Sequence, residues 1–262
     1  MSGPVEFGVD DRGVATVTLD RPDVHNAFDD ETIEVFNDLL GRIAKDTAIR
    51  AVVLEGRGKS FSAGADLNWM RRMATYTVEQ NRDDAMHLAR LMQALDSLPK
   101  PTIALVQGAA FGGGVGLAVC CDIVIACEDA RFSLSEVRLG LIPAVISPYV
   151  VAAIGPHQAR RYFITGEVFS ARTAQRIGLV HEVVAHEDLH ATRDALLDEI
   201  LRGGPEAQAC AKALVATVAN RPPDAALIAE TARLIAERRA ADEGREGIGA
   251  FLERRAPGWR LQ

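Results

Sequence analysis

Aromatic side chains are scarce in this chain of 262 residues, where phenylalanine, tryptophan and tyrosine together make up 5%. A surface that stacks nucleic-acid bases uses such rings, and a nucleic-acid binder also needs a basic face. The net charge of −7 argues against that face. The composition therefore disfavours a nucleic-acid partner, while it leaves room for a local basic pocket that holds a phosphorylated small molecule.

Long apolar runs are also missing, and cysteine is rare. Because no apolar run is long enough to span a bilayer, we expect no membrane partner. Residues 1–11 lack the basic and apolar regions of a signal peptide. The four cysteines, Cys120, Cys121, Cys127 and Cys210, fit no disulfide framework. We interpret them as free thiols in a reducing compartment and predict a cytoplasmic protein.

Hydrophobic residues are plentiful at 48%, which is enough to bury a sizeable core. Alternating apolar residues predict a strand over 14–19, and apolar residues at helical spacing predict helices over 29–44 and 79–98. Asp29 or Asp30 is a candidate cap for the first helix. Further short strands are expected at 50–54, 102–106, 123–126, 131–134 and 179–184. This alternation predicts an α/β fold with mainly parallel strands.

The C-terminal part has a different pattern, because from about Leu189 onward only helices are expected. Segments 191–201 and 225–240 are amphipathic. This part is too small to stand alone. It must pack on the core or on another subunit.

Three short motifs resemble known sites but lack essential parts. His186 to His190 matches the zinc-protease pattern H-E-x-x-H, but no third ligand follows at a familiar spacing. We interpret it as a polar loop and the first turn of a helix, and we predict no metal site. In Gly58-Lys59-Ser60, the first glycine of a phosphate-binding P-loop would fall at Val53. In the glycine run 112–116, the third glycine of a dinucleotide fingerprint would fall at Leu117.

Two loops rich in small residues, 56–67 and 107–114, carry a more specific signal. Small residues let the backbone approach a ligand closely. A glycine run that enters a helix directs free N–H groups at whatever binds there. Two such donors that converge on one oxygen form an oxyanion hole. Taken alone, each loop is equally consistent with a simple tight turn.

Together, in this order and spacing, the loops and their flanking segments resemble the crotonase (enoyl-CoA hydratase/isomerase) superfamily over nearly the whole chain. The segments that carry the resemblance are Arg21–Ala27 (R-P-x-x-x-N-A), Phe61–Leu67 (F-x-A-G-A-D-L), Pro101–Ala126, Arg131–Pro143 and Phe251–Arg255 (F-x-E-K-R). The resemblance implies a spiral of ββα repeats over 1–195 that binds the acyl-CoA. It also implies a helical region over 196–262 that forms a homotrimer, or a hexamer built as a dimer of trimers.

The resemblance further implies which residues bind the substrate. The thioester oxygen would meet the N–H groups of Ala65 and Gly113, and coenzyme A is part of the substrate, so no separate cofactor is expected. Lys59, and Arg254 or Arg255 of a neighbouring subunit, would contact the phosphates. The remaining residues expected around coenzyme A are Asn26, Ala27, Ala63, Gly64, Asp66 and Leu67.

Hydratases of this family usually carry two glutamates, and this chain matches one of them. The second corresponds to Glu136, whose carboxyl would act as general base on water, as general acid at the α-carbon, or as both in turn. The position of the first is Gly116. The alternative for Glu136 is a plain surface carboxylate.

The segment from Pro143 to Tyr149, together with Gly116, resembles the bacterial methylglutaconyl-CoA and carboxygeranoyl-CoA hydratases of leucine and acyclic-terpene catabolism. Such substrates carry a second carboxylate, for which Arg138 and Arg72 are candidate partners. We therefore expect an enoyl-CoA hydratase. The alternatives are an isomerase that moves a 3-enoyl double bond with Glu136 alone, and an acyl-CoA-binding protein with little catalysis.

Overall fold

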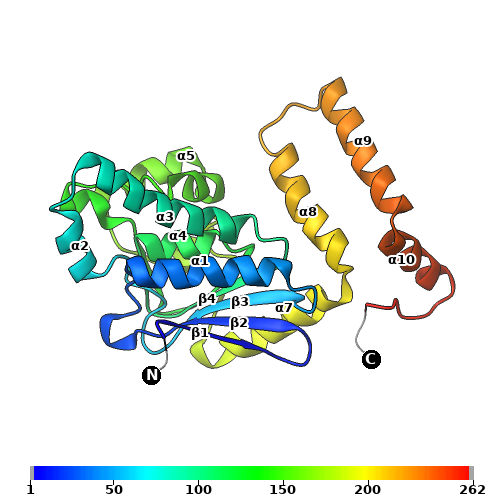
Figure 1. Cartoon of the computed structure of the whole chain (residues 1–262), viewed down its shortest axis with the longest axis horizontal. Helices are drawn as coiled ribbons and strands as arrows, with labels where there is room; N and C mark the ends of the chain where they lie inside the picture. Colours follow the sequence, from blue (N-terminus) through cyan, green and yellow to red (C-terminus); the bar gives the residue numbers. More distant parts are fainter. Residues whose placement is uncertain (1–2, 260–262) are drawn as a thin grey trace.

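The computed structural model describes residues 3–259, which form a layered α/β core and an arm of C-terminal helices (Figure 1). Residues 1–2 and 260–262, the outer ends of the two regions expected from the sequence, lie outside the described residues. Within residues 3–259, no helix is both long and apolar enough to cross a membrane.

The main sheet has six strands in the order β1-β2-β3-β4-β6-β9. Their bounds are β1 Val5–Val9, β2 Val14–Leu19, β3 Ala51–Gly56, β4 Thr102–Val106, β6 Ile123–Cys127 and β9 Glu182–Val184. The first pair is antiparallel, and every later neighbour pairs in parallel. This pairing confirms the predicted α/β fold. A second, three-stranded sheet contains β5 (Ala109–Phe111), β7 (Arg131–Ser133) and β8 (Phe169–Ser170).

Two long helices cover one face of the main sheet (Figure 1). Helix α1 spans Asp30–Lys45, and Asp29 caps it by accepting a hydrogen bond from the Thr32 N–H at 3.0 Å. Helix α3 spans Val78–Asp96, and Thr77 and Gln80 form a capping box at its start. Both helices confirm the predicted segments to within two residues at each end.

The other helices connect the strands or form the arm. They are α2 (Leu67–Met73), α4 (Gly113–Val119), α5 (Ser147–Thr165), α6 (Ala171–Arg176), α7 (Leu189–Arg202), α8 (Pro205–Val218), α9 (Ala225–Ala240) and α10 (Asp242–Leu252). Short 3₁₀ turns occur at η1 (Pro22–Val24), η2 (Ser135–Leu139) and η3 (His186–Asp188). Helix α5 is kinked at Gly155, which has a φ of 72° and precedes Pro156.

Alternating residues of the strands divide the core into two clusters. Val52 and Leu54 of β3 belong to the larger cluster, which also contains residues of α1, α3 and α4. Ala51 and Val53 belong to the smaller one, which α7 closes with Leu189 and Leu197. Helix α7 therefore packs on the sheet, and the boundary that we predicted after residue 195 falls within it. The division into two regions itself stays a prediction.

The strand predicted over 179–184 is wrong in its first half. Gly178 has a φ of 91°, and the Leu179 N–H donates to the Ala174 carbonyl at 2.9 Å. The chain therefore turns at Leu179 and Val180, whose side chains are buried in the core. Their apolar character reflects burial in a turn, and the strand begins at Glu182.

The arm of α8, α9 and α10 projects away from the sheet and its covering helices (Figure 1). Lys212 of α8 forms an ion pair with Asp122 at 2.9 Å. Arg50 donates to the carbonyls of Gly203 at 2.8 Å and Trp259 at 2.9 Å. Several apolar side chains of the arm are exposed, among them Phe251 at 82% and Leu252 at 73%.

Candidate active site

The segment from Arg21 to Ala27 is held by the buried side chain of Asn26. Its Oδ1 accepts from the Arg21 N–H at 2.9 Å, while its Nδ2 donates to the Ser60 carbonyl at 2.7 Å and to the Arg57 carbonyl at 2.9 Å. Asn26 has a left-handed φ of 54°, which asparagine adopts more readily than most residues. One side chain thus ties this segment to the loop after β3.

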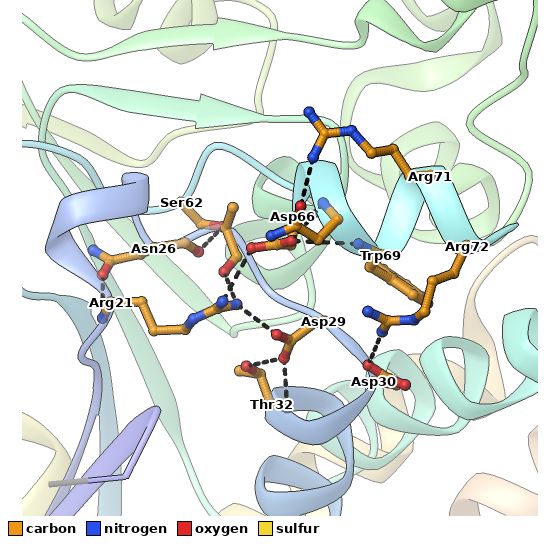
Figure 2. A network of polar contacts seen from close by, with 12 residues as sticks. Arg21, Asn26, Asp29, Asp30, Thr32, Ser62, Asp66, Trp69, Arg71 and Arg72 are labelled. Atoms are coloured by element: carbon orange, nitrogen blue, oxygen red, sulfur yellow. Dashed lines mark hydrogen bonds and ion pairs between the residues drawn. The ribbon is translucent and has the colours of Figure 1, made fainter. Parts of the chain in front are cut away.

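The Arg21 guanidinium lies between two carboxylates (Figure 2). Its Nη1 is 3.1 Å from Asp29 and its Nη2 is 3.0 Å from Asp66. Asp66 is buried, and its other oxygen caps α2 by accepting from the Asn68 N–H at 2.8 Å and the Trp69 N–H at 3.3 Å. The charge of Asp66 is therefore compensated on both sides, which fixes the backbone immediately after Ala65.

The two small-residue loops lie directly against each other. The Ser62 N–H donates to the Ala109 carbonyl, and the Phe111 N–H donates to the Ser62 carbonyl, both at 3.0 Å. Gly64 has a φ of 88°, and a Cβ at this position would lie 2.7 Å from the Phe111 oxygen and 3.5 Å from the Gly113 nitrogen. Only glycine fits this approach, which places the segment of Ala65 beside the start of α4.

Phe28 contacts both loops, through its backbone on one side and its ring on the other. Its N–H donates to the Gly64 carbonyl at 2.8 Å, and its carbonyl accepts from the Asp66 N–H at 3.0 Å. A Cβ on Gly113 would lie 2.4 Å from Cζ of the Phe28 ring. Within residues 3–259, neither the Ala65 N–H nor the Gly113 N–H donates a hydrogen bond. Two backbone donors from adjoining segments are thus available to a ligand oxygen.

Glu136 lies next to this pair of donors. It belongs to η2, which follows β7, and the Gly112 N–H donates to the Ser133 carbonyl at 2.8 Å. A Cβ on Gly112 would lie 3.1 Å from Oε1 of Glu136, so the carboxyl sits over the residue that precedes Gly113. Its Oε2 is buried and has no hydrogen-bond partner among the described residues. Glu136 is therefore not a solvated surface carboxylate.

Burial raises the pKa of Glu136 and outweighs a backbone hydrogen bond that acts in the opposite direction. A carboxyl with a raised pKa exchanges protons more readily near neutral pH than an ordinary glutamate does. Together with the free Oε2, this property suits a general acid and base.

Gly116, the position of the first of the family's two glutamates, has no space for a side chain. A Cβ on Gly116 would lie 2.3 Å from Cγ2 of Ile146 and 3.1 Å from Cε of Met92. Both neighbours are buried, Ile146 at 3% exposure and Met92 at 0%. The side chains of Ile146 and Met92 thus fill the space that a carboxyl at position 116 would need.

The structure places the predicted cations in different parts of the molecule. Lys59 is exposed in the loop after β3, whereas Arg254 and Arg255 follow α10 in the arm. Arg255 is engaged by Glu246 at 2.6 Å and by Glu253 at 2.7 Å. Of the candidates for a second substrate carboxylate, Arg72 pairs with Asp30, and Arg138 is exposed beside Gly166.

The segment from His186 to His190 is a 3₁₀ turn followed by the first residues of α7, which confirms its interpretation as a loop and helix start. His186 Nδ1 is 3.4 Å from the Cys127 thiol, and His190 Nδ1 is 3.0 Å from Arg193. In residues 3–259, no group of three or more His, Cys, Asp or Glu side chains gathers as a set of metal ligands.

Residues 10–262 match the family model for enoyl-CoA hydratase/isomerase. The chain belongs to this family. It is 33% identical to the short-chain-enoyl-CoA hydratase of Clostridium acetobutylicum, over 92% of each chain. An enoyl-CoA hydratase structure from Shewanella pealeana is 46% identical, covers 98% of this chain and 96% of its own, and has a TM-score of 0.95. Pseudomonas aeruginosa AtuE is 35% identical, with 99% and 100% covered and a TM-score of 0.93.

These matches confirm the crotonase-like fold and identify the chain as an enzyme of the enoyl-CoA hydratase/isomerase family. The structure brings together Asn26, Ala27, the loop 63–67, Gly113 and Glu136. Three supporting residues were not singled out from the sequence: Phe28, Ser62 and Ile146. Phe28 and Ser62 directly follow or lie within recognised motifs, so motif position was a usable signal for them. Ile146 lies within the variant segment from Pro143 to Tyr149, but no local pattern indicates its contact with Gly116, 30 positions away.

Proposed function

We propose that this protein is an enoyl-CoA hydratase that adds water across the 2,3 double bond of a 2-enoyl-CoA. The observation that carries the proposal is the position of Glu136, whose carboxyl lies against Gly112, next to the Gly113 amide. Among residues 3–259, its buried Oε2 has no hydrogen-bond partner and the N–H groups of Ala65 and Gly113 donate no hydrogen bond. The hydratase names of the relatives from Clostridium acetobutylicum and Shewanella pealeana support the same reaction.

In this proposal, the Ala65 and Gly113 N–H groups bind the thioester oxygen and stabilise the negative charge that develops there. The Glu136 carboxylate accepts a proton from water as the water oxygen bonds to C3. The electron pair of the double bond moves toward the thioester, and the protonated Glu136 then gives a proton to C2. The carboxyl ends in its starting state, so one group suffices for both transfers.

The test is turnover of crotonyl-CoA and 3-methylglutaconyl-CoA by the purified protein, with identification of the alcohol. Glu136→Gln should lower kcat by about 10²- to 10⁴-fold, the usual contribution of a positioned acid–base group. Affinity for a saturated acyl-CoA should stay unchanged. Glu128→Gln is the matched control, because Glu128 is exposed and pairs with Arg172 at the surface. Full turnover in Glu136→Gln would remove Glu136 from the mechanism.

One observation favours a second candidate reaction. Because Ile146 fills the space beside Gly116, the site offers one carboxyl, and a single carboxyl can remove a proton from a 3-enoyl-CoA and return it at a different carbon. Conjugated product without alcohol from a 3-enoyl-CoA would favour this isomerase. Tight binding of acyl-CoA without turnover on a broad panel of 2- and 3-enoyl-CoAs would favour a binding protein.

We also propose finer properties of the enzyme. The acyl group carries a second carboxylate, as in methylglutaconyl-CoA, in line with the variant segment from Pro143 to Tyr149. The chain forms a trimer or a hexamer through its arm, which is supported by the exposure of Phe251 and Leu252.

Lys59 and a neighbour's Arg254 contact the phosphates of coenzyme A. Light scattering tests the assembly, and weakened CoA binding in Lys59→Ala tests the contact. The buried free thiols favour a cytoplasmic location.

A further inference from the structure

Gly112, the cap residue before α4, and Gly116 within α4 face different partners. The Gly116 N–H donates to the Gly112 carbonyl at 3.2 Å, while Gly112 itself has a non-helical φ of 50°. The side-chain direction of Gly112 leads to the Glu136 carboxyl at 3.1 Å, and that of Gly116 leads to the Ile146 methyl at 2.3 Å. Hydrocarbon thus fills the space beside Gly116, while the Glu136 carboxyl borders the space beside Gly112.

We propose that Ile146 is a reaction-determining residue, because its side chain occupies the space that a carboxylate at position 116 would need and so keeps the acid–base chemistry on Glu136 alone. This inference rests on the proposed function and adds the residue that sets the number of carboxyls in the site. Ile146 acts by excluding a group. It does not touch the reacting atoms.

Ile146 is buried and held at the start of α5. Its carbonyl accepts from the Val150 N–H at 3.1 Å, because Ile146 is the cap residue of α5. Met92 closes the other side and contacts the Cys120 thiol at 3.8 Å. A glutamate at position 116 would collide with Ile146, and its charge would be buried among apolar groups at a high cost. Gly116 and Ile146 must therefore change together.

The first experiment adds a side chain at position 116 and removes the one at position 146. Gly116→Glu with Ile146→Gly introduces a carboxyl at position 116 and removes the side chain that fills its space. We expect Gly116→Glu alone to lower kcat/KM for crotonyl-CoA at least tenfold, and the double variant to regain at least tenfold over that single variant. The control is Gly116→Glu with Ile154→Gly, since Ile154 is a buried residue of the same helix that vacates space elsewhere. It should regain nothing.

The pH profile gives an independent readout. The wild type should show one carboxyl ionisation in kcat/KM, and the double variant should show two. A double variant that is no more active than Gly116→Glu, or that is matched by the Ile154 control, would overturn the proposal.

A smaller pair of substitutions keeps the proposal testable if the exchanged variant does not fold. Gly116→Ala should lower the melting temperature in the wild type, where its Cβ would lie 2.3 Å from the Ile146 methyl. It should lower it less in an Ile146→Ala background, where the nearest remaining atoms lie 3.1 Å away. Equal effects in both backgrounds would overturn the contact. This melting cycle needs no turnover, so it separates failure of the inference from failure of the proposed function, which would appear as a wild type inactive on every enoyl-CoA.

Discussion

Replacing Asn26 by alanine should damage both the stability and the activity of this enzyme. The change removes the acceptor of the Arg21 N–H and the donor to the Ser60 and Arg57 carbonyls. Each buried partner left without a hydrogen bond costs about 1–3 kcal/mol. Arg57 is exposed and can turn to water, so two partners carry the cost. Alanine also loses about 1–2 kcal/mol in the left-handed conformation. We expect a loss of roughly 3–8 kcal/mol in the free energy of unfolding.

The assay is urea unfolding at pH 7, with the midpoint and the slope measured separately. Asn220→Ala is the matched control, because Asn220 also has a left-handed φ, of 58°, but is exposed and makes no side-chain hydrogen bond within residues 3–259. Asn220→Ala should lose only the free energy that comes from placing alanine in the left-handed conformation. Because Asn26 positions the loop of Ala65, kcat/KM should fall in Asn26→Ala alone. Equal destabilisation in the two variants would refute the role of the buried hydrogen bonds.

Three further predictions concern single groups. Gly113→Ala should be less stable in urea unfolding and should lose turnover, because its Cβ would lie 2.4 Å from the Phe28 ring. The control is Gly41→Ala, whose Cβ would have no atom within 4 Å and whose stability should be unchanged or higher. Burial raises the pKa of Glu136 above its ordinary 4.5, so its charge opposes folding only as the pH rises above that value. Glu136→Gln should then raise the melting temperature at pH 8 and leave it nearly unchanged at pH 4, and the reverse order would contradict the burial. Burial also raises the pKa of Cys121 to about 12 and of Cys127 to about 11. Iodoacetamide at pH 8 should therefore label the native chain at Cys210 alone, and the unfolded chain at all four cysteines. Labelling of Cys127 in the native chain would contradict this prediction.

The sequence predicts those parts of the fold that depend on local chemistry. The Asp29 cap and the apolar spacing of α1 are contained in one short segment, and the structure has both. Strands β2, β3, β4 and β6 are short, largely buried and separated by helices, so their parallel order follows from the alternation. The loops of Ala65 and Gly113 are visible in the sequence because their close approach requires small residues. A side chain at Gly64 or Gly113 would collide with its neighbours.

Contacts between distant segments were not predictable. The second sheet was missed in part because β5 has three residues and β8 has two, too few to show a period. Helix α5 was missed because Pro148, Gly155 and Pro156 all occur within it. The contact of Ile146 with Gly116 joins a helix start to a helix interior, and nothing in either segment alone specifies it.

The vibration of the bound thioester carbonyl tests the central claim most directly. A 2-enoyl-CoA with a ¹³C-labelled carbonyl would be bound to Glu136→Gln, in which turnover is slow, and measured by difference infrared spectroscopy. Two hydrogen bonds from Ala65 and Gly113 should shift the C=O band to lower frequency than in water, and Gly113→Ala in the same background should reduce that shift. A band at the aqueous frequency in the bound complex would contradict the assignment of these amides as the oxyanion hole.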